Sequence, residues 1–287
     1  MMVAIALPEV APARPRLRIK RIRWSVVAAV FVLVVAALAA IWPQVFTTVD
    51  PTYADPALSH LPPSPQHWAG TDFQGRDLLV RIIYGARYSL LIGVGAVATS
   101  TIIGTVLGVT AGSGPAWLDQ VISRALDILC AFPGVLLALM FIAFTGPGLP
   151  NLILALGIGG IPSIARVARA EVFIAKTSGY VEQARTYAIP SWRIVLRHVL
   201  PNALGPLPVL VTLGLGGAIV GSSGLSFLGL GPQPPTAEWG LMLADSRSYL
   251  RHAWWTGVFP GVALTAVVIA ATVLGRYLQR RYERRLR

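Results

Sequence analysis

The segment 182–201 reads EQARTYAIPSWRIVLRHVLP and lies between two apolar stretches long enough to cross a bilayer. Its first part favours a helix that Pro190 stops, and a second helical pattern covers residues 192–200. Proline cannot continue a helix interior, so the second helix is expected to end at Pro201. The segment therefore predicts two short helices joined by a bend.

Small and basic side chains distinguish this segment from an ordinary loop. Ala184 and Ala188 are four residues apart, which would place both on one helix face and leave room for another protein to approach. The basic and imidazole side chains around them are Arg185, Arg193, Arg197 and His198. A loop that is basic for topology alone would explain the arginines, but not a bent helix pair with an alanine face.

The composition points to a polytopic membrane protein. Of the 287 residues, 55% are hydrophobic and 13% are charged, and the mean hydropathy is +0.66, which is too apolar for an ordinary soluble domain. Helices are expected, because a lipid-exposed backbone must satisfy its own polar groups. Six stretches reach the length of about 20 residues that a spanning helix needs. They are 24–45, 88–112, 121–145, 149–168, 203–224 and 257–278.

The placement of the basic residues predicts the orientation of these spans. The net charge is +12, and all but five of the 24 Lys and Arg residues lie in the two tails, the central loop and the connection after the second span. The five on the other side are Arg76, Arg81, Arg87, Arg247 and Arg251. The positive-inside rule therefore puts both termini and the central loop in the cytoplasm. This placement favours topology signals and contacts with membrane lipids over nucleic-acid binding.

The first apolar stretch also has the shape of a cleaved signal peptide, because basic residues precede it and Ala37-Leu38-Ala39 resembles a cleavage site. The apolar run nevertheless continues through Ile41 and Trp42. We therefore expect this stretch to be retained as the first span.

The segment quoted first resembles the EAA loop of ABC-importer permeases. The pattern of that loop is Glu-Ala-Ala, then a Gly, then an ending similar to His-x-Leu-Pro. Glu182, Ala184 and the ending 198–201 match, whereas Gln183 replaces an Ala and Ala188 replaces the Gly. In that family the loop docks into a groove on a separate ATPase subunit, and the resemblance implies the same role here.

Alanine keeps the small volume of glycine but not its easy bend, so Pro190 is expected to supply the bend. The residues that the resemblance assigns to the coupling loop are Glu182, Gln183, Ala184, Arg185, Ala188, Pro190, Trp192, Arg197, His198 and Pro201.

Three further segments resemble the C-type subunit of the dipeptide/oligopeptide/nickel permeases and follow the order of that family. They are 70–90 (GTDFQGRDLLVRIIYGARYSL), 124–133 (RALDILCAFP) and 225–243. Altogether the resemblance covers about residues 66–265, and it implies the permease fold of type I ABC importers. Where the family usually has a Glu, this chain has Ser222, so no acidic site is implied there.

One predicted feature lies just before the second span, and another lies within it. From Asp77 onward, a helix with its apolar residues on one side is predicted to lie on the membrane surface before that span. Gly104, Gly108 and Gly112 repeat a small-xxx-small pattern, which lets helix backbones approach closely, either within the chain or between subunits.

The third span carries a charged pair and a cysteine. Asp127 is expected to pair with Arg124, three residues earlier, rather than to relay protons. Cys130 is the only cysteine of the chain, which excludes an internal disulfide and a cysteine-based metal site. Its place in a span predicts core packing.

The sequence shows no catalytic or ATP-binding motif. A phosphate-binding loop needs Gly-Lys-Ser/Thr, whereas the only lysines, Lys20 and Lys176, follow Ile19 and Ala175. Paired carboxylates and a nucleophile–base set are also missing, so the chain is not expected to be an enzyme. No catalytic, cofactor or metal residue is assigned, and ATP with Mg would bind to a partner ATPase.

The resemblance implies one half of the membrane channel of an ABC importer in the cell membrane. The implied partners are a second, different permease subunit, two ATPase subunits or one fused ATPase, and an external substrate-binding protein. A peptide is the expected solute, with nickel or another small solute as the alternative. A secondary transporter or channel is a further alternative, although such proteins usually carry functional charges inside their spans. The last alternative is a membrane anchor without a transport function.

These predictions divide the chain into five segments. They are a basic cytoplasmic tail (1–23), a first transmembrane helix (24–45), an extracytoplasmic loop with an interfacial helix (46–87), a permease core of five transmembrane helices (88–278) with the coupling loop at about 169–202, and a second basic cytoplasmic tail (279–287).

Overall fold

The computed structural model describes residues 24–286. The expected basic tail at 1–23 and Arg287 lie outside the described residues, as do the side chains of Arg185 and of residues 284–286. Every regular element of the described part is helical, apart from an isolated bridge between Thr71 and Asp77. The predicted all-α fold is confirmed.

Five helices within residues 24–286 are long and apolar enough to cross a membrane. They are α1 (Trp24–Ile41), α2 (Leu78–Ser113), α5 (Leu149–Lys176), α9 (Leu207–Phe227) and α11 (Trp255–Leu286). In place of the span predicted at 121–145, the chain forms α3 (Ala116–Ala131) and α4 (Gly134–Thr145), which meet at an angle of 92°. This pair together has the length and apolarity of a sixth span.

The bend between α3 and α4 follows from Pro133. A proline disfavours the helical conformation of the residue before it, and Phe132 is accordingly extended, with φ −95° and ψ 136°. α3 therefore ends at Ala131, and α4 starts directly after the proline. A proline inside an apolar stretch predicts a kink or a helix start, and the span predicted at 121–145 is accordingly divided into two helices at Pro133.

α2 begins earlier than the second span was predicted to begin. Its N-cap Asp77 accepts a hydrogen bond from the backbone N–H of Val80 at 3.0 Å, and the helix then continues for 36 residues. The helix predicted to start at Asp77 is therefore confirmed, and it continues into the second span without a break. A helix of this length measures about 54 Å, which exceeds the roughly 30 Å of a hydrocarbon core.

Glycines let α2 lie directly against α5. A Cβ atom at Gly108 would overlap the carbonyl oxygen of Ala165, and one at Gly112 would come within 2.7 Å of Val172. Gly104 is just as close to α5, where a Cβ atom would come within 2.8 Å of a side chain. The small-xxx-small pattern therefore serves packing within this chain.

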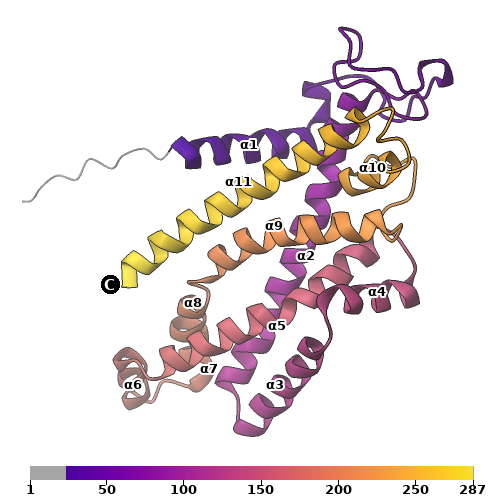
Figure 1. The fold of residues 1–287 in the computed structure, drawn as a ribbon. Coiled ribbons are helices and arrows are strands. Elements are labelled where there is room, and N and C mark those ends of the chain that lie inside the picture. The colour runs from indigo at the N-terminus through magenta and orange to yellow at the C-terminus, as the bar shows by residue number, and fades with distance from the viewer. Residues whose placement is uncertain (1–23, 287) are drawn as a thin grey trace, which may run out of the picture.

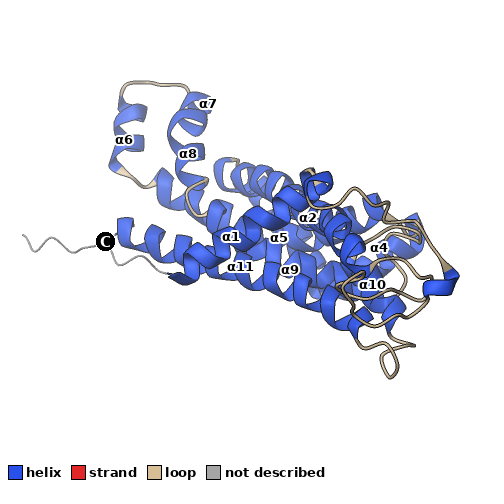
Figure 2. Ribbon diagram, turned by 90° about the horizontal axis from the view of Figure 1, so that it is seen from above, coloured by secondary structure: helices blue, strands red, loops and turns tan. Residues whose placement is uncertain are grey.

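The long helices form a layered bundle in which α11 lies between α1 and α9, while α2 contacts α1, α5 and α9 (Figure 1). The remaining elements are short: η1 (Pro43–Val45), η2 (Pro56–Leu58), α6 (Gly179–Thr186), α7 (Ser191–Ile194), η3 (Val195–Val199), α8 (Leu200–Ala203) and α10 (Trp239–Ser246). Figures 1 and 2 place α6, α7 and α8 at the same end of the bundle as the C-terminus and the start of α1. α10 and the loop after α1 lie at the opposite end.

Candidate functional site

A central cavity of about 530 Å³ opens between α2, α4, α5 and α9. None of the described residues that line it carries a charge, and its polar side chains are the hydroxyls of Ser100 and Ser163. The volume falls within the range of about 300–1,000 Å³ that small-molecule sites occupy. The cavity therefore has the size and neutrality to admit a small solute without an ion pair.

Glycines keep this central cavity open. A Cβ atom added at Gly134, Gly159 or Gly217 would meet no other atom within 4 Å, and all three residues line the cavity. The three packed glycines of α2 differ, because a Cβ atom added at any of them would contact α5. The sequence alone did not predict which glycines line a cavity, because both kinds lie in apolar helices.

The segment after α5 folds into the two short helices that the sequence predicts, with a different joint. α6 ends at Thr186, and Ala188 has the left-handed φ of 52°. The chain therefore turns at Ala188, where the related EAA loops have glycine, and the expectation that Pro190 alone replaces that bend is wrong. Pro190 instead precedes the first residue of α7.

The second short helix continues past Pro201, where it was expected to end. α7 passes into a π-helical turn, η3, in which the backbone N–H of Leu200 bonds to the carbonyl of Val195, five residues earlier. The chain then passes into α8, where Pro201 lies in the first turn. The missing N–H of a proline is tolerated in a first turn, so the helical path extends to Ala203.

Ala184 faces the protein rather than a partner. It is 5% exposed and belongs to an apolar cluster with Val181, Ile194 and Val199, which packs against Val172 near the end of α5. Ala188 lies outside α6 and is exposed. The predicted alanine face, with both side chains open to another protein, is therefore wrong.

Most of the other predicted coupling residues lie on the outside of this bent segment. Trp192 is 60% exposed, and the guanidinium of Arg193 lies 5.1 Å from the centre of its ring. The ring of half-buried His198 lies 6.1 Å from that of Tyr180. The exposed members of the predicted set are Glu182, Gln183, Ala188, Pro190, Trp192, Arg197 and Pro201.

α5 joins the central cavity to the bent segment. Gly159, Gly160 and Ser163 of this helix line the cavity, whereas Val172 and Ala175 of the same helix pack against the inner apolar cluster of the bent segment. α5 has no break over its 28 residues, although it contains Pro162. One continuous helix therefore links the bent segment to the cavity wall.

An ion pair ties α3 to the middle of α5. The carboxylate of Asp127 accepts a hydrogen bond from Arg166 Nη2 at 3.0 Å. The expected pairing of Asp127 with Arg124 is wrong, because α5 packs beside α3 and brings a guanidinium from a distant part of the chain. Cys130 on the same helix is exposed, so its predicted core packing is wrong as well.

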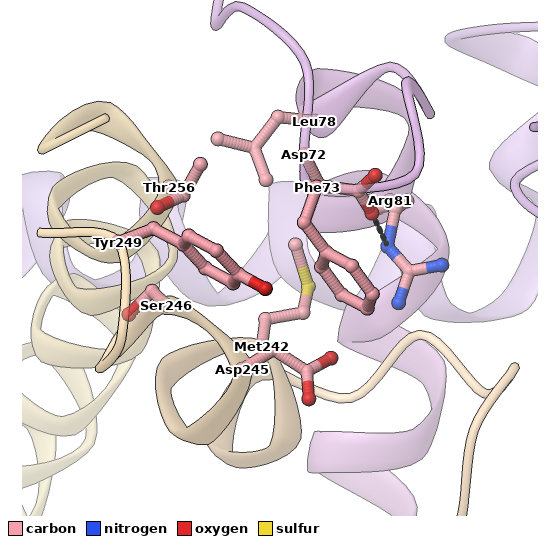
Figure 3. A pocket seen from close by; sticks show the side chains of 9 residues that line it. All are labelled: Asp72, Phe73, Leu78, Arg81, Met242, Asp245, Ser246, Tyr249 and Thr256. Carbon is pink, nitrogen blue, oxygen red and sulfur yellow. Dashed lines mark ion pairs between the residues drawn. The ribbon is translucent and has the colours of Figure 1, made fainter. Parts of the chain in front are cut away.

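Two buried arginines hold the loop after α1 at the other end of the bundle, and Figure 3 shows the ion pair of one of them, Arg81, with Asp72. Asp72 Oδ2 accepts a hydrogen bond from Arg76 Nε at 2.6 Å and lies 3.4 Å from Arg81 Nε. Arg81 Nη1 also donates to the carbonyl of Pro51 at 3.3 Å, and its Nη2 donates to that of Thr236 at 3.5 Å. Both arginines are only 2% exposed, and they connect α2 to the loop and to the α9–α10 connection.

Glu238 makes a second buried contact at this end. It is 0% exposed and caps α10, since its carboxylate accepts the backbone N–H groups of Gly240 at 2.9 Å and Leu241 at 2.8 Å. Ser89 of α2 donates to the same carboxylate at 3.2 Å and accepts the N–H of Trp239 at 3.1 Å. α10 is therefore fixed to α2 by buried hydrogen bonds.

A small pocket lies beside Asp72 and Arg81 of the arginine network, and Figure 3 shows the rings of Phe73 and Tyr249 in it. The rings stack with their centroids 5.8 Å apart. The pocket holds only about 10 Å³, so it is too small for a solute. Burial raises the pKa of the Asp245 carboxyl above its ordinary value of 3.8, although the charges of Arg81 and Arg76 act in the opposite direction.

Comparison with known proteins decides the family. Residues 104–287 match the family described as binding-protein-dependent transport system inner membrane component. This chain belongs to that family. The permease is 41% identical to the dipeptide transport system permease protein of Alkalihalophilus pseudofirmus. The alignment spans 238 residues, which are 83% of this chain and 78% of the relative.

Other relatives have related names. The permease is 39% identical to the glutathione transport system permease protein of Pectobacterium atrosepticum, over 88% of this chain and 83% of that one. It is 37% identical to the probable D,D-dipeptide transport system permease protein of Escherichia coli, over 85% of this chain and 82% of that one. The protein is thus the permease component of an ABC importer and a multi-pass membrane protein.

A solved structure shares the fold. The inward-facing MetNI methionine ABC transporter aligns with a TM-score of 0.58 and 23% identity, over 71% of this chain and 96% of the other. The predicted ABC-importer permease fold is confirmed by this likeness and by the family match. Permeases of this family work with a partner permease, an ATPase and a binding protein.

Proposed function

We propose that the permease forms half of the pathway through which an ATP-driven importer moves short peptides across the cell membrane. The names of the relatives support a peptide-like solute. The neutral lining of the central cavity supports it as well, because the described lining residues lack the carboxylate or imidazole ligands that a divalent cation prefers. Nickel or another small solute is the alternative, and uptake measurements distinguish it from a peptide.

Energy reaches this pathway from outside the chain. The bent segment 179–203, which we name the coupling segment, presents Glu182 and Trp192 on its exposed surface and is packed on α5 by its buried side. We infer that a separate ATPase docks on the exposed surface and that its closure on ATP moves α5 at the cavity. The proposal depends on one observation. α5 packs against the coupling segment and also forms part of the cavity wall.

The assembly follows from this role. A second, different permease subunit supplies the other half of the pathway, two ATPase subunits or one fused ATPase bind Mg-ATP, and an external binding protein delivers the peptide. The basic tails and the coupling segment face the cytoplasm, in accordance with the positive-inside rule.

Uptake of a labelled dipeptide by cells that lack their own peptide importers tests the proposal. Trp192→Ala and Glu182→Ala remove exposed side chains and leave the inner apolar cluster intact, so we expect normal membrane levels of the permease. For Trp192→Ala we expect about tenfold weaker recovery of the ATPase on purification, since truncating an aromatic anchor at an interface costs that much or more, and a parallel loss of uptake. Arg124→Gln, an exposed change outside the segment, is the control.

The outcomes separate the parts of the proposal. Full uptake and full ATPase recovery in both variants would show that the coupling segment is not the docking site. Nickel uptake without dipeptide uptake by the unaltered complex would replace the peptide by a metal ion and leave the docking role in place.

A further inference from the structure

A second cavity lies between the first turn of α1 and the last turns of α11. It measures about 170 Å³ and is lined by Ser25, Val26, Val273, Arg276, Tyr277 and Arg280. It shares no lining residue with the central cavity. α1 and α11 lie side by side here (Figure 1), so the cavity is a gap between two membrane-spanning helices at the end of the bundle where the basic tails begin.

Two guanidiniums concentrate positive charge in this cavity. Arg276 and Arg280 are four residues apart on one helix, where like charges repel and destabilise the helix. Among the side chains that the structure describes, neither has an ion pair. The nearby carboxylate of Glu283 instead accepts a hydrogen bond from Gln279 at 3.0 Å. An anion between the two arginines would relieve the repulsion.

The surrounding sequence adds positive charge rather than neutralising it. Residues 1–23, which precede α1, contain six Lys and Arg residues and a single acidic residue, Glu9. The last residues of the chain add Arg281, Arg284, Arg285 and Arg287. This excess of positive charge favours an anion from outside the chain.

The position of the cavity selects the class of anion. Beyond it, α1 exposes apolar side chains, including Val27, Phe31 and Val34, which are 47%, 67% and 50% exposed. Because α1 has the length and apolarity of a membrane-spanning helix, these exposed side chains are suited to contact acyl chains. A free anion would use only the polar end of this site, whereas a phospholipid would use the polar end and the apolar surface together.

We propose that this cavity binds the phosphate headgroup of an anionic phospholipid, which joins α1 to α11. The two arginines hold the phosphodiester oxygens, because a guanidinium fork matches phosphate geometry, and the hydroxyls of Tyr277 and Ser25 are placed to donate further hydrogen bonds. Basic pockets between transmembrane helices are suited to such headgroups.

Native mass spectrometry of the complete transporter, titrated with phosphatidylglycerol and separately with phosphatidylcholine, tests this site. In the double variant Arg276→Gln/Arg280→Gln we expect the affinity for phosphatidylglycerol to fall about 25-fold, about fivefold for each arginine removed. The control Arg124→Gln/Arg281→Gln removes two exposed arginines that do not line the cavity and should bind as the unaltered complex does. Tyr277→Phe deletes one hydroxyl alone and should produce a smaller loss.

Three results would overturn the proposal. One is equal binding of phosphatidylglycerol by the unaltered complex and the double glutamine variant. Another is an equal loss in the control variant, which would indicate a general charge effect. The third is displacement of the bound signal by inorganic phosphate at the same concentration as the lipid, which would indicate a site for free phosphate.

Discussion

Arg169 on α5 donates two hydrogen bonds to Asp119 on α3, from Nε to Oδ1 at 2.5 Å and from Nη2 to Oδ2 at 2.6 Å. The same guanidinium lies 4.8 Å from the ring centre of Phe173. Two turns further along α5, the ammonium of Lys176 donates to the carbonyl of Gly112 at the end of α2, at 2.5 Å. These contacts join α2, α3 and α5 next to the coupling segment.

Breaking the paired contact should weaken the bundle by a small, measurable amount. Arg169→Gln and Asp119→Asn are each expected to lower the free energy of unfolding by about 1 kcal/mol, because the pair is bidentate yet partly exposed. The double variant should cost little more than either single change, which unfolding of the purified permease can measure. Asp127→Asn is the matched control: its partner contact to Arg166 is more than half exposed, so a loss below about 0.5 kcal/mol is expected. Additive losses in the double variant would contradict a direct interaction.

Gly108 is expected to tolerate no side chain. A Cβ atom there would overlap the backbone of α5, so Gly108→Ala should destabilise the permease by about 1–3 kcal/mol through overpacking. Gly224→Ala on α9 is the control, because a Cβ atom there meets nothing within 4 Å. That change should be neutral or stabilising by up to about 1 kcal/mol, the difference in helix propensity. Equal thermal stability of the two variants would show that α2 and α5 do not pack as closely as described.

Ala188 is expected to carry backbone strain that glycine removes. Its φ of 52° lies in the left-handed region, which costs an alanine roughly 1–2 kcal/mol. Ala188→Gly should therefore stabilise the coupling segment, while the greater freedom of unfolded glycine reduces the gain to at most about 1 kcal/mol. Slower hydrogen exchange of residues 179–203 would report this gain, and Ala188→Val, which strains the same φ further, should exchange faster. Faster exchange in the glycine variant would contradict the strain.

The sequence predicted the helical class and the two short helices because both follow from local patterns. Apolar stretches of membrane-spanning length decide the first, and Pro190 with its flanking helix formers decides the second. A local pattern also explains the break in the third span, because a proline inside an apolar stretch predicts a kink or a helix start. The angle of 92° between α3 and α4, by contrast, does not follow from the sequence.

The features that the sequence did not predict depend on contacts between distant segments. Asp127 has a plausible partner three residues earlier, yet it pairs with Arg166, 39 residues away. Ala184 was expected to face a partner, but whether a small side chain faces inward depends on where α5 packs. The difference between a packed glycine such as Gly108 and an open one such as Gly217 likewise exists only in three dimensions.

Asp245 should make the stability of the outer end depend on pH. Its folded-state pKa is raised above 3.8, chiefly by burial, so the folded protein binds this proton more tightly than the unfolded chain does. The ionised carboxylate therefore lowers stability at neutral pH, and the loss disappears as the pH falls through the raised pKa. Asp245→Asn should raise the thermal stability of the complex at neutral pH and match the unaltered protein in acid. A destabilised asparagine variant at neutral pH would show that attraction to Arg81 and Arg76 outweighs burial.

Gly217 offers a direct test of whether the central cavity is the solute path. The residue lines the cavity, and no atom lies within 4 Å of the position that a Cβ atom would occupy, so a larger side chain fills space without displacing a neighbour. Gly217→Leu should therefore leave the amount and thermal stability of the complex unchanged. Because the narrowed cavity excludes bulky solutes first, uptake of a tripeptide with large side chains should fall more than uptake of dialanine. Gly224→Leu, on the same helix but outside the cavity lining, should reduce neither. If both variants import the two peptides at the unaltered ratio, the solute passes elsewhere.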